Sequence, residues 1–152
     1  MKHQFLLDEN ILHHAIKGVD ARNSPDLTAT KLALLIAQNC HKIVMNKELW
    51  NRYWQHLPDL LRPRPSALEP LFLLNQLVKN SAKLIWDSPQ APELPQGITV
   101  PPEDIPIVRI ALISRPKVVT ADGDLREAIN SQPSLGLTAL TPAEAIELAK
   151  DQ

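Results

Sequence analysis

The sequence has very little cysteine and few aromatic residues. Cys40 is the only cysteine among 152 residues, so it cannot form an intrachain disulfide and is expected to be a small buried hydrophobe. Aromatic residues make up 4% of the chain, which argues against an extended surface for stacking on nucleic-acid bases. No apolar run reaches membrane-spanning length, and Asp8 and Glu9 interrupt the first one too early for a signal peptide. We therefore expect a soluble cytoplasmic protein.

The sequence also lacks a dominant charge and the common nucleotide-binding motifs. The formal net charge is -1, so any contact with nucleic acid must be local. Neither a GxGxxG nor a P-loop pattern occurs, which lowers the expectation of dinucleotide or nucleotide binding. The histidines offer no zinc site, because His13 and His14 are adjacent and face different directions and the others are scattered.

What the chain does contain is an alternation of short apolar runs with amphipathic segments. Hydrophobic residues make up 44%, which predicts a globular fold, and the length fits a single domain spanning residues 1–152. Alternating strands and helices predict a three-layer α/β/α sandwich with a mainly parallel central sheet. The predicted strands are 5–7, 41–45, 82–86, 118–119 and 137–140. The predicted helices are 8–18, 24–39, 47–56, 66–80, 103–114, 122–129 and 142–149.

Two kinds of local signal set the boundaries of these helices. Ser24-Pro25-Asp26 predicts a helix that starts with Ser24 as its N-cap, and capping boxes occupy 66–69 and 141–144. The prolines between residues 88 and 102 predict an extended surface loop. The tryptophans of the 47–56 helix are expected to pack against a neighbouring helix.

The stretch from Lys117 to Ile129 organises the rest of the chain. Its strand ends at Thr120, and Asp122 and Asp124 follow before the next helix. Asp8 likewise ends the first strand. Parallel strands joined by right-handed crossovers place their carboxyl ends on one edge of the sheet, where several carboxylates can bind a hard cation. Such an Asp is also a common helix N-cap, and either interpretation fits these residues.

Three segments, in order and spacing, resemble the PIN domain. They are the first strand ending in Asp8 with Asn10 two residues on, 104–111, and 119–125. The resemblance covers nearly the whole chain. It implies a Mg²⁺- or Mn²⁺-dependent endoribonuclease that hydrolyses phosphodiester bonds of single-stranded RNA, as in VapC-type toxins. The partners it implies are the RNA substrate, an antitoxin protein and a second copy of the chain, with no membrane.

The resemblance also assigns roles to particular residues. The catalytic, metal-binding acids of the family match Asp8, Asp104 and Asp122, with Asp124 as a further metal ligand. The supporting polar residues match Asn10 and Thr120. Carboxylates suit this chemistry because they bind Mg²⁺, which neutralises the phosphate and lowers the pKa of bound water. Without metal, crowded carboxylates raise each other's pKa. Arg52 and Arg126 are candidate contacts for the RNA backbone.

The chain departs from the family pattern in the helix at 47–56. The family usually has a glutamate about two turns into that helix, where this chain has Arg52. Glu48, one turn earlier, either supplies the acid or pairs with Arg52 at i,i+4. We expect Glu48, and not Arg52, to point toward the site. Glu9, where the family often has a small hydroxyl residue, is a second departure. A missing acid favours an alternative, a degenerate PIN domain that binds RNA or a protein partner without catalysis.

Overall fold

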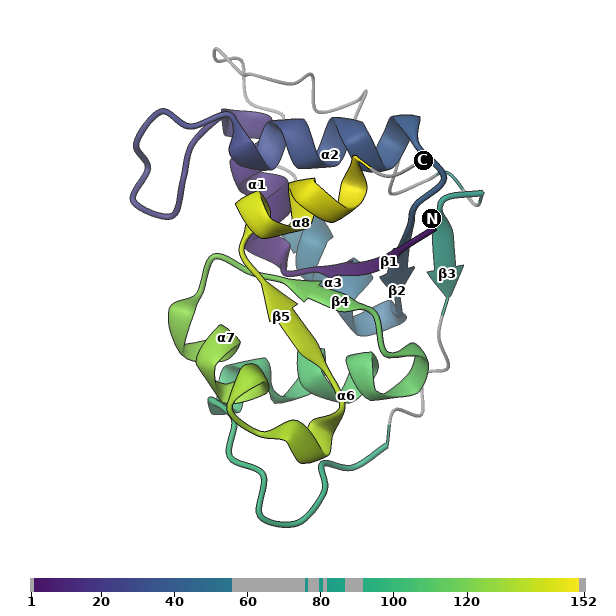
Figure 1. Ribbon diagram of the computed structural model, residues 1–152, viewed down its shortest axis with the longest axis vertical. Coiled ribbons are helices and arrows are strands. Elements are labelled where there is room, and N and C mark those ends of the chain that lie inside the picture. Colours follow the sequence, from purple (N-terminus) through teal and green to yellow (C-terminus); the bar gives the residue numbers. More distant parts are fainter. Residues whose placement is uncertain (1, 56–75, 77–79, 81, 87–91, 151–152) are drawn as a thin grey trace.

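The central element of the fold is one parallel sheet of five strands. The computed structural model describes residues 2–55, 76, 80, 82–86 and 92–150. The strand order is β3-β2-β1-β4-β5, and every pair is parallel (Figure 1). The strands are β1 (Gln4–Leu7), β2 (Lys42–Met45), β3 (Leu84–Trp86), β4 (Lys117–Val119) and β5 (Thr138–Leu140). The predicted parallel sheet is confirmed.

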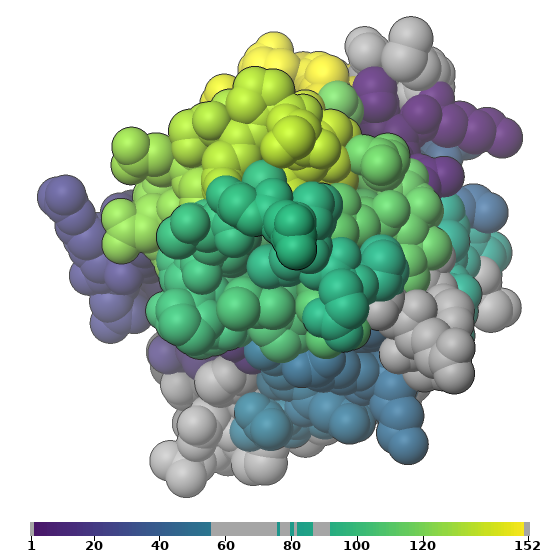
Figure 2. Space-filling model, turned by 90° about the horizontal axis from the view of Figure 1, so that it is seen from below, coloured from purple at the N-terminus to yellow at the C-terminus, as the bar shows by residue number. Residues whose placement is uncertain are grey.

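Helices cover both faces of this sheet. Helices α1, α2 and α8 pack together on one face, and α6 and α7 lie on the other (Figure 1). Figure 2, the view from below, shows α6, α7 and the residues just before α6 covering the second face. The helices are α1 (Glu9–Lys17), α2 (Thr28–Gln38), α3 (Lys47–Gln55), α6 (Ile105–Ser114), α7 (Gly123–Asn130) and α8 (Pro142–Ala149), with short 3₁₀ turns η2 (Pro102–Asp104) and η3 (Pro133–Leu135). The predicted three-layer α/β/α architecture is confirmed.

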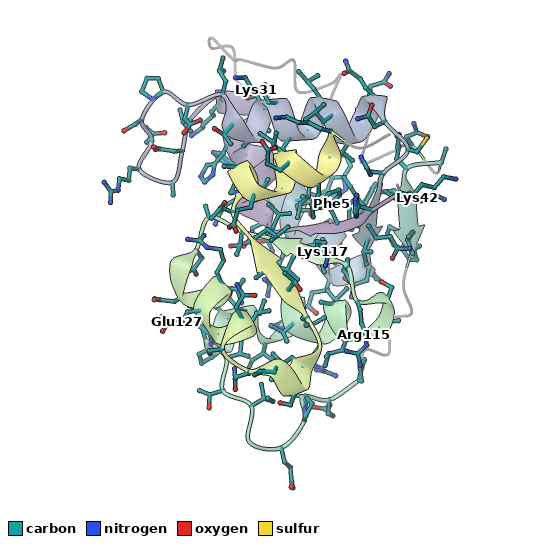
Figure 3. The ribbon with its side chains drawn as sticks, in the orientation of Figure 1. Phe5, Lys31, Lys42, Arg115, Lys117 and Glu127 are labelled. Carbon is teal, nitrogen blue, oxygen red and sulfur yellow. The ribbon has the colours of Figure 1, made fainter. Side chains whose placement is uncertain are left out.

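Strand β1 lies in the middle of the sheet and of the core. Phe5 pairs with Ile43 of β2 on one side and with Lys117 of β4 on the other. Residues 5–7 are fully buried, and the apolar side chains of β2 and β4 pack beside them. Figure 3 places Phe5 inside the molecule, whereas Lys31 and Glu127 project from the outer sides of α2 and α7. The end of β1 is therefore held from both sides.

Two predicted boundaries differ from the structure. Helix α2 begins at Thr28 and not after Ser24, because the Asp26 carboxylate accepts hydrogen bonds from the Thr28 amide and hydroxyl and turns the chain there. Residues Val19 and Pro25 form an antiparallel bridge before this turn. Helix α6 begins at Ile105 because η2 occupies the preceding residues.

The other predicted boundaries lie within two residues of the observed ones where the structure describes them. Pro106 lies in the first turn of α6, and Thr141 and Glu144 form the predicted capping box of α8. Residues 92–101 contain no helix or strand, as the prolines predicted. The predicted helix at 66–80 lies almost entirely outside the described residues. Within the described ranges, no helix is both long and apolar enough to cross a membrane.

The residues between α2 and β2 differ from the expectation for cysteine. Cys40 is exposed, and the neighbouring His41 takes the fully buried position. His41 Nε2 lies 2.9 Å from the carbonyl oxygen of Ala149, to which it donates, because His41 Nδ1 accepts from the amide of His3 at 3.1 Å. Asn39 donates to the same Ala149 oxygen at 2.7 Å. These hydrogen bonds join the end of α8 to the amino-terminal edge of the sheet.

Replacing His41 tests this joint. We expect His41→Ala to lower the free energy of unfolding by about 2–4 kcal/mol, because it opens a cavity and leaves the partly buried amide of His3 without its acceptor. Urea unfolding followed by circular dichroism measures the change. Cys40→Ala, one residue earlier and exposed, is the matched control and should change stability by less than about 0.5 kcal/mol. Equal effects of the two substitutions would contradict the proposed role of His41.

Candidate active site

The end of β1 positions Asp8 rigidly. The amide of Asp8 donates to the carbonyl of Val119 at 3.0 Å, which continues the pairing of β1 with β4. The hydroxyl of Tyr53, buried on α3, donates to the carbonyl of Leu7 just before it. The Asp8 side chain is only 5% exposed, although it precedes a helix. It forms no side-chain cap of α1, so the capping interpretation is wrong for Asp8.

Thr120 connects Asp8 to the turn that carries Asp122. The buried Thr120 hydroxyl donates to Asp8 Oδ2 at 2.8 Å and accepts from the amide of Asp122 at 3.0 Å. The Thr120 amide donates to Leu140 at 3.1 Å, which ties the turn to β5. Thr120, predicted as a supporting polar residue, therefore lies between the two acids and orients one Asp8 oxygen.

Asp122 serves as the N-cap of α7, as the capping interpretation predicted for it. Its Oδ1 accepts from the amide of Asp124 at 2.9 Å and from that of Leu125 at 3.4 Å. These bonds use one carboxylate oxygen, and the side chain is exposed. Capping does not exclude metal binding, because Oδ2 lies outside the cap.

Asp104 is the third acid at this edge, at the end of η2. Its side chain is 7% exposed, and Oδ2 is buried without a hydrogen-bond partner among the described residues. Burial raises the pKa of Asp104 to about 6, and the negative charges of Asp8 and Asp122 contribute. Burial also raises the pKa of Asp8, with a contribution from Asp122 that the Thr120 hydrogen bond opposes. The charges of the predicted acids therefore affect the pKa values of both Asp8 and Asp104, although Asp8 precedes Asp104 by more than 95 residues in the sequence.

Arg52 is the nearby cation. Its guanidinium, with the side chain 21% exposed, donates to the carbonyl of Glu103 at 3.2 Å. Its positive charge lowers the pKa of both Asp8 and Asp104. Arg52 stands where the family pattern has an acid. Its positive charge partly compensates the negative charge of the buried carboxylates.

Glu48 does not point toward the acids, contrary to our expectation. Its side chain is 55% exposed and lies 3.8 Å from the Arg52 guanidinium, at i,i+4. Its charge is absent from the groups that shift the pKa of Asp8 or Asp104. The structure supports the pairing alternative, and Arg52 is the residue of α3 directed toward the acids. The helical spacing placed both residues on one face but did not show which of them leans toward β1.

Two other predicted residues lie apart from the acids. Asn10 is exposed and lines a hollow with His13, His14 and Lys17 on α1. Asp124 is exposed and lines a different hollow with Thr99 and Glu127. Both are near the site in sequence, but their side chains do not join Asp8 and Asp104. Tyr53, which anchors the end of β1, was missed because in the sequence it is only one member of an apolar stripe.

The chemistry of these donors suits Mg²⁺ or Mn²⁺, though the ligand set is small. Among the described residues, no group of three or more His, Cys, Asp or Glu side chains is arranged to hold a metal ion. Mg²⁺ commonly binds through one or two carboxylates and keeps several waters. The unpartnered Oδ2 of Asp104 and the oxygen of Asp8 that Thr120 leaves unused are hard, anionic ligands of that kind. The residues therefore fit an ion held by few protein ligands.

Comparison with known proteins identifies the fold. No model of a known protein family matches the chain, and no curated protein sequence matches it. A solved structure does: a PilT N-terminus domain protein from the hyperthermophilic archaeon Sulfolobus solfataricus, with a TM-score of 0.53 over 98% of this chain and 95% of that one. The chain has the PIN-domain fold. At 12% identity, the likeness to this PIN-domain protein extends to the fold and not to an activity.

The raised pKa of Asp104 predicts how the PIN-like fold responds to pH without divalent metal. A carboxyl whose pKa is about 6 in the folded state and about 4 when unfolded stabilises the fold when protonated. This contribution is present below pH 4 and is lost as the pH rises to 6. Asp104→Asn cannot ionise, so it does not lose this stability as the pH rises. Its free energy of unfolding relative to that of the wild type should therefore increase by roughly 2 kcal/mol between pH 4 and pH 7.

Urea unfolding in EDTA at several pH values measures this difference. Glu127→Gln, an exposed acid on α7, is the control and should follow the wild type at every pH. If the free energies of unfolding of Asp104→Asn and the wild type differ by a constant amount from pH 4 to pH 7, the pKa of Asp104 is not raised in the folded protein.

Proposed function

We propose that the protein is a metal-dependent endoribonuclease that hydrolyses phosphodiester bonds of single-stranded RNA at Asp8, Asp104 and Asp122. The observation that carries the proposal is a pair of buried, mutually repelling carboxylates, one with an unpartnered oxygen, at the carboxyl edge of a PIN-type sheet. Such an arrangement does not stabilise a fold, because burying like charges is unfavourable. A divalent cation would relieve this cost.

Each acid would contribute differently to holding the ion. Asp8 has one oxygen fixed by Thr120 and offers the other, and Asp104 offers its buried Oδ2. Asp122, with Oδ1 in the helix cap, would act through Oδ2 or through a bound water. When bound, Mg²⁺ or Mn²⁺ would neutralise charge on the phosphate and lower the pKa of a coordinated water. The rigid attachment of Asp8 to two strands would keep this geometry constant during the reaction.

The substrate class rests on the family resemblance and on local charge. The overall net charge of -1 provides no general attraction for nucleic acid, so RNA contacts would come from single residues. Arg52 lies beside the acids, and Arg126 donates to the carbonyl of Thr120 at 2.8 Å from the first turn of α7. We propose that both guanidinium groups contact the bound RNA. A toxin role, with an antitoxin as protein partner, is the finer form of this proposal.

One observation favours the second candidate, a degenerate PIN domain that binds RNA or a protein without cutting. Arg52 supplies a positive charge close to Asp8 and Asp104, where it partly replaces the charge of a metal ion. A site neutralised by its own arginine needs metal less than the family site with an additional glutamate. The two candidates therefore differ in metal affinity, which can be measured without any RNA.

Replacing Asp8 tests the catalytic proposal. Asp8→Asn keeps the side-chain volume and an acceptor for Thr120, but removes the charge that would hold the ion. We expect it to abolish Mg²⁺-dependent cleavage of single-stranded RNA while leaving folding intact or slightly stabilised, because it relieves repulsion among the acids. Cleavage of labelled RNA with Mg²⁺ or Mn²⁺, and with EDTA as a blank, measures the loss.

Asp124→Asn is the matched control for Asp8→Asn. It makes the same chemical change on an exposed acid at the same edge, and should retain cleavage within a few-fold. Equal cleavage by wild type and Asp8→Asn would indicate a contaminant or another site. No cleavage by the wild type, together with no metal binding in calorimetry, would favour the non-catalytic candidate.

Arg52→Gln distinguishes the two candidates through metal binding. Glutamine keeps a donor for the Glu103 carbonyl but removes a positive charge beside the acids, so Mg²⁺ should bind roughly tenfold more tightly than to the wild type. Isothermal titration calorimetry measures both affinities, with Asp8→Asn as the variant expected to bind poorly. If Arg52→Gln binds Mg²⁺ no better than the wild type, the guanidinium does not compete with an ion and the acids are not its site.

A further inference from the structure

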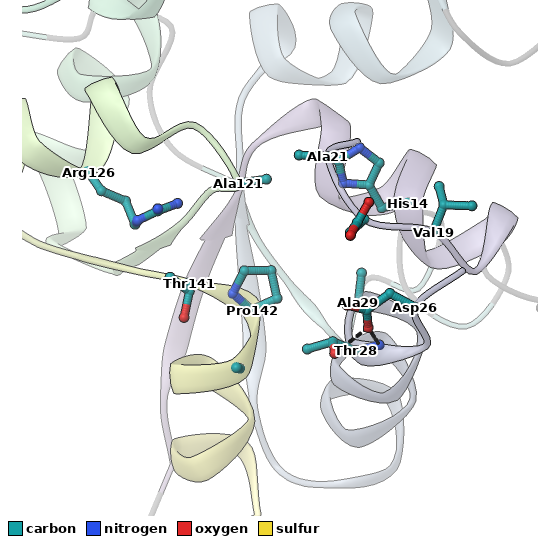
Figure 4. Close-up of a pocket in the computed structure, with 12 residues that line it drawn as sticks. His14, Val19, Ala21, Asp26, Thr28, Ala29, Ala121, Arg126, Thr141 and Pro142 are labelled. Atoms are coloured by element: carbon teal, nitrogen blue, oxygen red, sulfur yellow. Dashed lines mark hydrogen bonds between the residues drawn. The ribbon is translucent and has the colours of Figure 1, made fainter. Parts of the chain in front are cut away.

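A pocket of about 260 Å³ lies beside the acids, at the same edge of the sheet (Figure 4). It is formed by the end of α1 with the segment after it, the start of α2, the turn between β4 and α7, and the start of α8. Ala121 joins the pocket to the proposed active site, because it lies between Thr120 and Asp122 in the chain. Arg126, on another side of the pocket, holds the Thr120 carbonyl. A group bound here would lie next to the residues that would hold the scissile phosphate.

The walls of the pocket are small and apolar. Four alanines and Pro142 line it, and their short side chains leave apolar space between the helices. Pockets that enclose whole drug-sized ligands are usually about 300–1,000 Å³, so this one fits a smaller group. Proteins that hold a single base outside a nucleic-acid stack enclose it between apolar side chains and read its polar edge.

The charged groups that line the pocket disfavour an anionic ligand. Asp26 lines one side of the pocket and Arg126 lines another (Figure 4). Asp20 also lines the pocket. His14 adds no positive charge at pH 7, because burial lowers its pKa. Two carboxylates against one guanidinium disfavour a phosphate at this position. A neutral ligand with both donors and acceptors meets both kinds of group.

The unused hydrogen-bonding atoms narrow the choice of base. Asp20 Oδ1 accepts from the amides of Arg22 and Ser24, and Asp26 Oδ1 accepts from Thr28, so Oδ2 of each carboxylate lies outside these bonds. Arg126 uses one of its five donors on Thr120. Guanine presents neighbouring N–H donors on one edge and the O6 and N7 acceptors that arginine binds on another. The other bases lack one of these pairs.

We propose that this pocket binds the guanine base of the nucleotide next to the cleaved phosphate, with Asp26 accepting from the base and Arg126 donating to it. This assignment rests on the proposed ribonuclease function for its biological meaning, but binding of the base itself does not require catalysis. It makes the protein selective for the sequence around the cleavage site.

Titration with free nucleosides tests the pocket separately from cleavage. Guanosine added at millimolar concentration to the ¹⁵N-labelled protein should shift the amide signals of Ala21, Ala29 and Ala121, whereas adenosine, cytidine and uridine should not. Asp26→Asn keeps the Oδ1 acceptor for Thr28 and replaces the free oxygen, so guanosine binding should weaken at least fivefold. Glu127→Gln, an acid outside the pocket, should bind guanosine as the wild type does.

The outcomes separate this inference from the proposed function. Guanosine binding at the pocket without RNA cleavage supports the base site and removes the catalytic proposal. RNA cleavage with no guanosine shift, or with equal shifts for all four nucleosides, overturns the base site and leaves the catalysis. Shifts caused by N-acetyl-arginine amide in place of guanosine would make the pocket a docking site for a protein partner and would also overturn the inference.

Discussion

The hydroxyl of Thr120 is the interaction on which the site depends. By donating to Asp8 and accepting from the Asp122 amide, it joins the ends of two adjacent strands into one unit. It fixes one oxygen of Asp8. Because Thr120 is also tied to β5 and is held by Arg126, the turn that shapes the neighbouring pocket moves with the acids. A shift of this one residue would therefore change both the cation site and the adjacent base site.

Charge balance is the second constraint on this edge of the sheet. Asp8 and Asp104, both at most 7% exposed, lie close enough for the charge of Asp8 to raise the pKa of Asp104, and the Arg52 guanidinium partly offsets the charge of both. A fold built only for stability would fill these positions with apolar side chains. The buried Oδ2 of Asp104 has no hydrogen-bond partner among the described residues, which is consistent with the proposed cation site. Arg52 adds a positive charge beside these acids, so its effect on metal affinity tests the nuclease proposal against the binding-domain alternative.

The sequence predicted the sheet and the acidic edge well, for physical reasons. Short β-branched runs such as Val118-Val119 can be little other than buried strands, and parallel strands bring their carboxyl ends together. Local patterns could not show which polar atoms meet across the fold. Asp8 and Asp122 look alike in sequence, yet only Asp122 caps its helix, because the Asp8 carboxylate is turned toward Thr120. Glu48 and Arg52 share one helix face, and only tertiary packing decided that Arg52 reaches the acids. The pocket beside Ala121 could not be predicted from the sequence, because its residues come from four separate segments.

A crystal structure with bound Mn²⁺ tests the central claim most directly. The anomalous signal of manganese locates the ion independently of any assay. We predict one Mn²⁺ at the carboxyl edge of β1, with an oxygen of Asp8 and Oδ2 of Asp104 each about 2.1 Å from it and water in the remaining positions. Manganese absent from this edge at millimolar concentration, or bound only to exposed acids such as Glu147, would contradict the account.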